Sequence, residues 1–136
     1  MADGKEFQLK ILTPDKETFN GAVSYVKAPG VGGYFGILVN HAPMLSALDI
    51  GEMEIEANNE RKMYAVSGGF LEVLNNQVSV LAETAEPATE IDIARAEASR
   101  KRAEERMKSE NVDVDFDRAQ LALHRSINRL KVSKKI

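Results

Sequence analysis

The sequence predicts an antiparallel β-sandwich over residues 1–87, followed by an antiparallel two-helix hairpin over residues 88–136. Up to residue 82, short apolar runs alternate with Gly, Pro, Asn and Asp, which is the pattern of short strands. After Pro87 glycine and proline vanish, and apolar residues recur at helical spacing. Charge divides at the same point, because residues 1–87 carry 6 Lys and Arg against 12 Asp and Glu, whereas residues 88–136 carry 12 against 9. The two regions are therefore expected to face different partners.

Short strands are expected throughout the first region. They include Phe7 to Leu12, Val23 to Lys27, Met53 to Ala57, Met63 to Ser67, Phe70 to Leu74 and Val78 to Ala82. Asn58-Asn59 and Asn75-Asn76 separate neighbouring strands, and asparagine tolerates the positive φ that tight hairpins require. Strands this close along the chain favour an antiparallel sandwich or barrel. No βαβ unit is apparent, so a Rossmann-type domain is not expected.

Two helices are expected in the second region, from about Glu90 to Ser109 and from about Asp115 to Lys131. Thr89 is placed to cap the first helix, and Asp92 three residues later nearly completes a capping box. The apolar stripe of the second helix consists of Phe116, Ala119, Leu123, Ile127 and Leu130. The facing stripe of the first consists of Ile93, Ala96, Ala103 and Met107, and Arg100 interrupts it.

This seam predicts a marginal hairpin. An alanine buries about one methyl group, on the order of 0.8 kcal/mol, whereas ordering a residue costs roughly 1 to 2 kcal/mol of backbone entropy. The short connection from Glu110 to Asp113 favours an antiparallel pair. We expect an appendage with two states, which opens where another surface accepts its apolar stripe.

The composition argues against several functions. The chain has no cysteine and only two histidines, so a zinc or iron site is not expected. No apolar run approaches the roughly 20 residues of a membrane span, and the first residues lack the features of a secretory signal, so a cytosolic location is expected. The basic helices lack the aromatic residues that stack nucleic-acid bases, apart from Phe116. His41 lies in an expected loop without a nucleophile or carboxylate partner at motif spacing, so no catalytic residue is proposed.

Three motifs carry a resemblance to a known family. They are Gly36-Ile37-Leu38-Val39-Asn40-His41-Ala42-Pro43, Ser67-Gly68-Gly69-Phe70-Leu71-Glu72-Val73 and Val80-Leu81-Ala82-Glu83-Thr84-Ala85-Glu86. In this order and spacing they resemble the epsilon subunits of F-type ATP synthases, and the resemblance covers essentially the whole chain. Taken alone, Gly36 would be a turn glycine, and Gly68-Gly69 a bulge or a close backbone approach.

The resemblance implies a non-catalytic subunit of the rotor. Its expected partners are the gamma subunit, the ring of membrane c subunits and, when the helices extend, the catalytic alpha and beta subunits. It would associate with the cell membrane on the cytoplasmic side, only through the complex, in a proton-translocating synthase. Residues 31–35 and 41–44 fall where family members approach the ring. Family members commonly have a polar or acidic residue before the glycine of this segment, whereas this sequence has Gly32-Gly33-Tyr34-Phe35. The detailed contacts with the ring therefore do not carry over from the family.

A nucleotide site is implied as well. Ile91-Asp92-Ile93-Ala94-Arg95-Ala96 resembles the Ile/Leu-Asp-x-x-Arg-Ala motif with which some bacterial epsilon subunits bind one ATP as a regulatory ligand. By this resemblance the nucleotide-binding residues are Glu86, Asp92, Arg95, Arg102, Arg125 and Arg129. Glu86 and Asp92 would face the adenine or ribose. No glycine-rich loop followed by Lys-Ser/Thr is present, so hydrolysis is not expected.

Hairpin geometry supports this expectation independently. A turn centred near Val112 places Arg95 and Arg129 side by side, since each lies 17 residues from that point. Arg125 lies one turn from Arg129, and Arg102 two turns from Arg95. Converging guanidinium groups repel one another but suit a triphosphate. The alternatives are a solvated helix face with Asp92 as a cap, or a free-standing ATP-sensing module that needs no partner for its sandwich.

Overall fold

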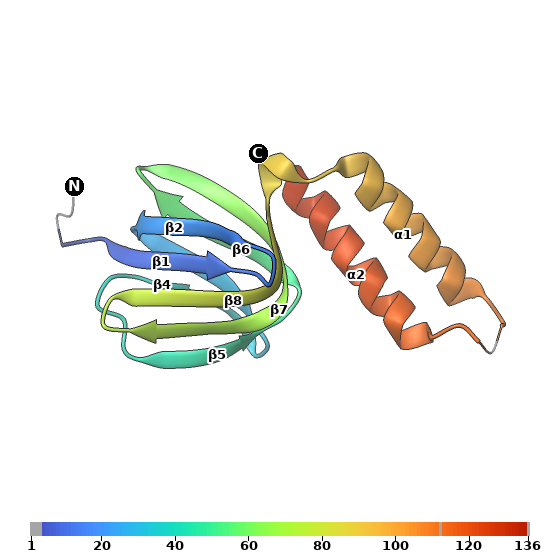
Figure 1. Ribbon diagram of the computed structural model, residues 1–136, viewed down its shortest axis with the longest axis horizontal. Coiled ribbons are helices and arrows are strands. Elements are labelled where there is room, and N and C mark those ends of the chain that lie inside the picture. Colours follow the sequence, from blue (N-terminus) through green and yellow to red (C-terminus); the bar gives the residue numbers. More distant parts are fainter. Residues whose placement is uncertain (1–3, 112, 136) are drawn as a thin grey trace.

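The computed structural model describes residues 4–111 and 113–135, in which eight strands precede two helices (Figure 1). The strands are β1 (Phe7–Leu12), β2 (Glu17–Val23), β3 (Tyr25–Gly30), β4 (Gly33–Ile37), β5 (Met44–Leu48), β6 (Gly51–Ala57), β7 (Glu60–Leu74) and β8 (Gln77–Pro87). A short 3₁₀ helix (Ala88–Glu90), α1 (Ile93–Lys108) and α2 (Phe116–Ser133) follow. The predicted sandwich and two-helix arrangement is confirmed.

The long strands β7 and β8 tie the sandwich together. One edge of β7 pairs first with β6, at residues 60–66, and then with β5, at residues 69–73, while the other edge pairs with β8. The strand order is β2-β1-β8-β7-β5-β3-β4, with β6 bridging β3 and β7. Most pairs are antiparallel, as predicted. β1 and β8, the first and last strands, are parallel neighbours.

Two asparagine pairs form the tight turns that the sequence predicts. Asn58 and Asn59 join β6 to β7 with φ of 55° and 61°, and Asn75 and Asn76 join β7 to β8 with φ of 50° and 60°. Positive φ at both central residues matches the right-handed twist of a hairpin. These turns fix the register of β6, β7 and β8.

Gly68 and Gly69 lie between two strands expected from the sequence, Met63 to Ser67 and Phe70 to Leu74. In the structure both belong to one strand, β7, which continues through the glycines. Both glycines have positive φ, 67° and 121°. A Cβ on Gly69 would lie 2.0 Å from the carbonyl oxygen of Leu81, so the backbone of β8 leaves no room for a side chain. The close backbone approach considered from the sequence is therefore present, at the point where β7 passes from its β6 partner to its β5 partner.

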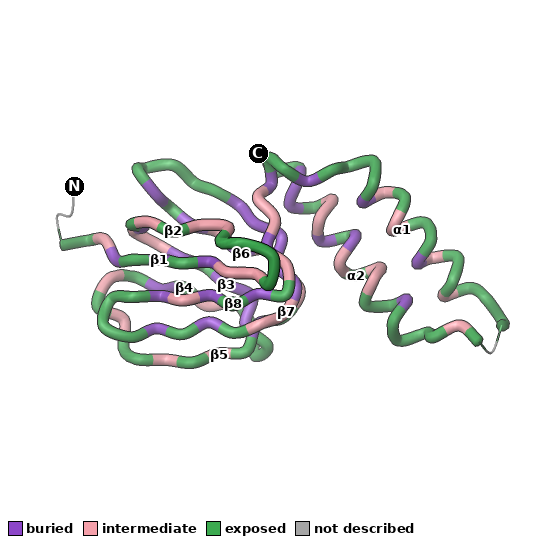
Figure 2. The backbone as a smooth tube through the Cα atoms, viewed as in Figure 1, coloured by how far each residue is buried: buried purple, intermediate pink, exposed green. Residues whose placement is uncertain are grey.

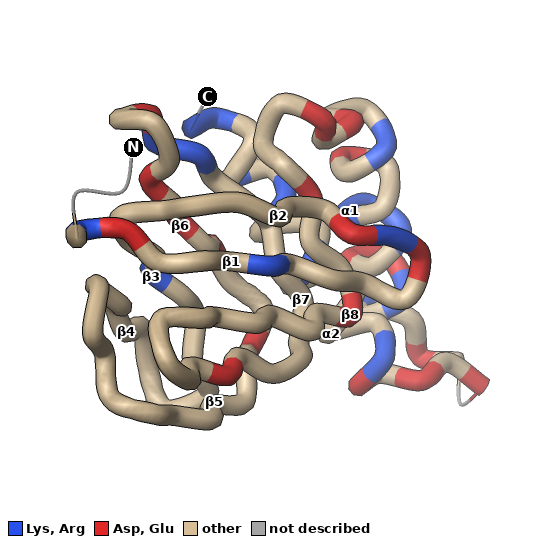
Figure 3. Tube along the Cα trace, turned by 60° about the vertical axis from the view of Figure 1, so that its left-hand side comes forward, with Lys and Arg blue, Asp and Glu red and all other residues tan. Residues whose placement is uncertain are grey.

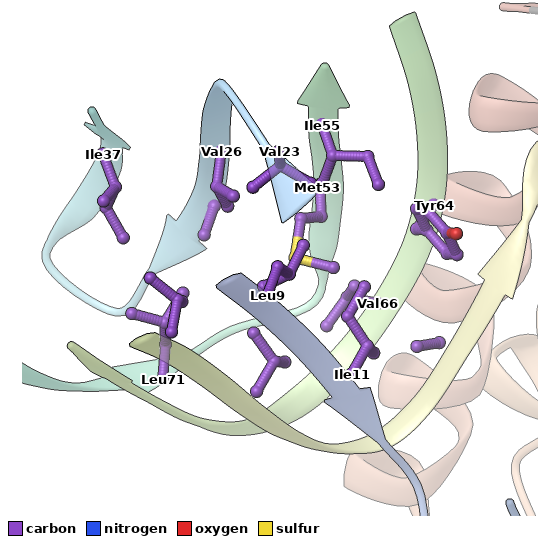
Figure 4. Close-up of a cluster of buried hydrophobic side chains, with 14 of the residues drawn as sticks. Leu9, Ile11, Val23, Val26, Ile37, Met53, Ile55, Tyr64, Val66 and Leu71 are labelled. Atoms are coloured by element: carbon purple, nitrogen blue, oxygen red, sulfur yellow. The ribbon is translucent and has the colours of Figure 1, made fainter. Parts of the chain in front are cut away.

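The main core lies between the layers of the sandwich, where inward-facing residues from several strands meet (Figure 4). Leu9, Ile11, Met53, Ile55 and Leu71 are fully or almost fully buried there. A second, smaller cluster joins the sandwich to the hairpin. This junction cluster consists of Met63, Ala65, Ala88, Ile91 and Val132. The hairpin shows much less burial than the sandwich (Figure 2).

Several strand predictions require correction. The expected strand Val23 to Lys27 spans the boundary between β2 and β3, at Ser24. Strands β4 and β5 lie in the region where short strands are expected, but they are not among the ranges that the sequence singles out, because their apolar residues neither alternate cleanly nor form a long run. Gly36 is no turn glycine, since it lies within β4, where a Cβ would come within 3.0 Å of the Tyr25 ring.

The helices begin at aspartates. Asp92 is the N-cap of α1, and its Oδ1 accepts the backbone N–H of Arg95 at 3.0 Å. Thr89, the predicted cap, instead lies in the 3₁₀ helix, because the chain turns there before α1 starts. Asp115 caps α2 in the same way through the N–H of Arg118. Val112, the expected centre of the turn, lies outside the described residues.

Gly69→Ala should lower the free energy of unfolding by about 3 kcal/mol, because the new methyl group meets the Leu81 carbonyl at a φ that alanine avoids. Chemical denaturation measures the change. Gly32→Ala is the matched control, since nothing lies within 4 Å of a Cβ there. Equal stability of the two variants would contradict this account of the β7 bend.

Candidate functional site

A cavity of about 410 Å³ lies where the sandwich meets the hairpin. Its wall comes from the β1–β2 turn, the end of β8, the 3₁₀ helix, α1 and α2. Five of the six residues proposed from the sequence line this cavity: Glu86, Asp92, Arg95, Arg102 and Arg129. Residues far apart in the chain are thus brought to one site, of a size typical for small-molecule ligands.

The helices supply the basic wall. Arg95 and Arg102 lie on α1, and Arg129 approaches from α2. Arg102 Nη2 donates to Ser99 Oγ at 3.0 Å, which directs this side chain along the cavity. Within the described residues, the Arg95 side chain has no ion-pair or hydrogen-bond partner. These guanidinium groups provide donors suited to an anionic ligand.

Carboxylates supply the opposite wall. Glu83, Glu86 and Glu90 come from the end of the sandwich and the 3₁₀ helix. Glu86 Oε1 accepts from Arg129 Nε at 2.6 Å, so one ion pair crosses the cavity. The two side chains are 36% and 29% exposed, so solvent screens this pair only partly. Charges of both signs are dense on the hairpin side of the molecule (Figure 3).

Arg125 does not line this cavity. It lies in an adjoining pocket with Arg129, Ser99 and Glu83, one helical turn from Arg129. Among the described residues its guanidinium has no ion-pair or hydrogen-bond partner. The predicted convergence therefore holds for Arg95, Arg102 and Arg129, with Arg125 at the border.

Sequence reasoning missed the contribution of the β1–β2 turn. Thr13, Asp15 and Lys16 line the same cavity, which a motif in the helices gives no reason to expect. The Thr13 hydroxyl donates to the Lys16 carbonyl and accepts the Lys16 N–H, which fixes the turn. The parallel pairing of β1 with β8 brings this turn beside Glu86.

The seam between the helices is thin, as predicted, and its buried alanines belong to the expected stripes, but several larger residues of those stripes are exposed. Ala96, Ala103 and Ala119 are buried, whereas Ile93, Phe116 and Ile127 are 55%, 51% and 47% exposed. The other buried residues of α2 are Ser126, Asn128, Val132 and Ser133. Leu123 and Leu130 are half-buried and Val132 is buried, so only part of the apolar stripe of α2 is exposed to solvent.

The C-terminal end of α2 carries most of the attachment to the sandwich. Val132 is fully buried in the junction cluster. The buried Asn128 Nδ2 donates to the Gly51 carbonyl at 2.8 Å. Glu52 Oε2 accepts from Lys135 at 2.6 Å, and Glu52 Oε1 lies 3.5 Å from Lys131 Nζ. Apolar packing, a buried hydrogen bond and an ion-pair network therefore act within residues 128–135, at the end of α2 and just after it.

The charge of Glu52 is stabilised by its partners. Burial raises the pKa of its carboxyl, but hydrogen bonding and attraction from Lys135, with a further contribution from Lys131, outweigh it. The pKa of Glu52 consequently lies below its ordinary value of 4.5.

A separate apolar surface lies on the outside of the sandwich. Phe70 on β7 and Leu81 on β8 are cross-strand partners and are 55% and 56% exposed. Leu45 on β5, 70% exposed, belongs to the same sheet. We call Leu45, Phe70 and Leu81 the outer apolar face. Strands β4 and β5 contain no charged residue (Figure 3).

Other site classes gain no support from the described residues. Within residues 4–111 and 113–135, no group of three or more His, Asp or Glu side chains is placed to hold a metal ion. Neither of the helices there has the length and apolarity to cross a membrane.

Comparison with known proteins gives matches over almost the whole chain. Residues 6–88 match a model of the β-sandwich domain of the ATP synthase delta/epsilon chain, and residues 89–134 match its long α-helix domain. An ATP synthase epsilon chain from Desulforamulus reducens is 44% identical over 96% of this chain and 98% of its own. One from Nitratidesulfovibrio vulgaris is 48% identical over 94% and 96%.

Solved structures share the fold at low identity. A chain in the Euglena gracilis mitochondrial ATP synthase has a TM-score of 0.77 at 23% identity, over 88% of this chain and 76% of that one. A chain in the central stalk and c-ring structure of the Tetrahymena thermophila mitochondrial ATP synthase has a TM-score of 0.58 at 18% identity, over 94% and 93%. These likenesses support the arrangement of sandwich and helices.

Acid should loosen α2 from the sandwich. Because the pKa of Glu52 is lowered in the folded state, its stabilising contribution is complete above about pH 4.5 and is lost as the pH falls through the folded-state pKa. Hydrogen-exchange protection factors of α2 amides, measured between pH 7 and 3, should show this loss. Glu52→Gln should lack that part of the transition, and identical pH profiles would contradict the assignment.

Proposed function

Since this chain belongs to the ATP synthase delta/epsilon chain family, we propose that it is a non-catalytic rotor subunit of a proton-translocating F-type ATP synthase. In the central stalk it couples the gamma subunit to the c-ring. Its hairpin inhibits ATP hydrolysis when it extends toward the catalytic alpha and beta subunits. Bound, unhydrolysed ATP stabilises the folded hairpin. The subunit meets the membrane only through the complex, on the cytoplasmic side.

The cavity between sandwich and hairpin carries the nucleotide part of this proposal. Three guanidinium groups face it from two helices, and carboxylates face it from the sandwich side. A triphosphate fits the basic wall, because arginine forks bind phosphate oxygens with charge-assisted hydrogen bonds. The adenine amine and ribose hydroxyls are donors that suit the opposite wall, including Glu86. Because Glu86 pairs with Arg129, a phosphate competes with this carboxylate for one guanidinium.

The same site gives the ligand a physical effect on the hairpin. α1 is connected to the sandwich by the 3₁₀ helix and contributes Arg95 and Arg102, while α2 contributes Arg129. A ligand that contacts all three elements binds only when they are together, so binding favours the folded state. Its effect is limited by the difference between its affinities for the two states. The thin alanine seam keeps the competing open state within reach.

The outer apolar face supports a protein partner for the sandwich. Leu45, Phe70 and Leu81 expose large apolar side chains on adjoining strands, and such patches mark interaction sites. We assign the gamma subunit to this face. The c-ring is assigned to the β3–β4 turn and the start of β4, where Val31 and Tyr34 are 65% and 53% exposed.

A free-standing ATP-sensing module is the alternative. It needs the same arginines but gives the outer apolar face no partner. Co-purification separates the two functions, because a subunit of the stalk should be recovered with gamma, whereas a free sensor should be recovered alone.

Isothermal titration of the chain with ATP should show one binding site. Arg95→Ala and Arg129→Ala should each weaken binding by about tenfold, because each removes charge-assisted hydrogen bonds. Arg106→Ala and Arg118→Ala are matched controls, since both arginines are exposed and lie outside the cavity. Absence of binding by the parent chain would remove the nucleotide site and leave the rotor role standing.

Truncation after Pro87 should raise the ATPase activity of the assembled complex, because it removes the inhibitory helices. Assembly should be intact, since the sandwich keeps its own core. The measurements are ATP hydrolysis by the purified complex and recovery of gamma with the truncated chain. Unchanged activity in a complex that retains the truncated chain would contradict inhibition by the hairpin.

A further inference from the structure

Glu52 lies outside the cavity, yet it is closely tied to the helix that carries Arg129. It belongs to β6, and its side chain is only 13% exposed. Its carboxylate contacts Lys131, in the last turn of α2, and Lys135, which follows the end of that helix. None of these three residues lines the cavity with the arginines. Glu52 can therefore influence the cavity only indirectly, through the position of α2.

Helical geometry places Arg129, which lines the cavity, and Lys131, which contacts Glu52, on opposite sides of α2. At about 100° per residue, Lys131 lies roughly opposite Arg125 and Arg129 on α2, and Lys135 follows two residues after the helix ends at Ser133. The sandwich thus contacts α2 from two directions, through the ion pair of Glu52 with Lys131 and through that of Glu86 with Arg129. A shift of the last two turns would move Arg129 away from the cavity.

The strand under Glu52 is itself firmly placed. The Glu52 backbone N–H donates to the Tyr34 hydroxyl at 3.0 Å, and the preceding Gly51 carbonyl accepts from Asn128. A Cβ on Gly51 would lie 2.5 Å from Pro29 and 2.7 Å from the Tyr34 hydroxyl. Lys27 Nζ lies 5.3 Å from the centre of the Tyr34 ring. Glu52 is consequently a fixed point on the sandwich against which α2 is aligned.

We propose that Glu52 is a positioning residue of the nucleotide site, which sets the place of Arg129 through its ion pairs with Lys131 and Lys135. This inference rests on the proposed ATP site. It makes the affinity for ATP depend on a carboxylate that touches no ligand. It also gives Lys131 and Lys135, although both are solvent-exposed, the role of aligning α2 with the sandwich.

Glu52→Gln keeps the shape of the side chain and removes its charge. We expect it to weaken ATP binding by about fivefold, measured by isothermal titration. Glu54→Gln is the matched control. Glu54 lies on the same strand and pairs with Arg61 of β7 at 3.0 Å, so its ion pair remains within the sandwich. Its substitution should leave the affinity for ATP unchanged.

Two further measurements distinguish positioning from general loss of stability. Glu52→Gln should lower the hydrogen-exchange protection of the last two turns of α2 and leave that of the β1 and β8 amides unchanged. Reversal of both ion pairs, with Glu52→Lys, Lys131→Glu and Lys135→Glu, should restore most of the affinity that Glu52→Lys alone loses.

The outcomes separate this inference from the proposed function. If the parent chain binds no ATP, the nucleotide site itself is lost. If the parent binds and Glu52→Gln binds equally well, only the positioning role is overturned. The same holds if protection falls equally in the sandwich, or if the reversed ion pairs restore no affinity.

Discussion

The attachment of α2 to the sandwich is the interaction on which the arrangement of the second region depends. The helices bury little against each other apart from alanines, so their mutual contact contributes little to holding them in place. What holds them is concentrated at one end, where Val132 enters the junction cluster and Asn128 reaches the Gly51 carbonyl. The opposite end of the hairpin extends away from the strands (Figure 1). A short attachment of this kind resists motion near the sandwich far better than at the helix connection.

This arrangement explains why the cavity lies where it does. It is bounded by the last residues of β8, the start of α1 and the end of α2, all close to the attachment. A ligand there strengthens the part of the hairpin that is already held. It therefore alters the balance between docked and released helices without contacting the far end of the hairpin. The long strands β7 and β8 complete the arrangement, because both contribute residues to the main core and the end of β8 places Glu86 in the cavity wall.

Much of this architecture could be predicted from the sequence, for local physical reasons. The asparagine pairs tolerate the positive φ that tight turns require, and the change from glycine-containing to glycine-free sequence marks the boundary at Pro87. Arg95, Arg102 and Arg129 were found through a family motif and hairpin symmetry. The contribution of Lys16 depends on how distant segments meet, because the β1–β2 turn reaches the cavity only through the pairing of β1 with β8. The exposure of Phe116 and Ile127 likewise follows from the tilt of α2, which periodicity alone does not determine.

The parallel pairing of β1 with β8 has a consequence for how the chain acquires its structure. Gln8 pairs with Gln77, so the second edge of β1 can form its backbone hydrogen bonds only after β8 is available. Contacts of such long sequence separation slow folding, because a large loop must close before they form. During synthesis, β1 and β2 can pair early, but closure of the sandwich requires β8 to have emerged. The helices follow β8 in the chain, so they meet a sandwich whose docking surface is completed only at that late step.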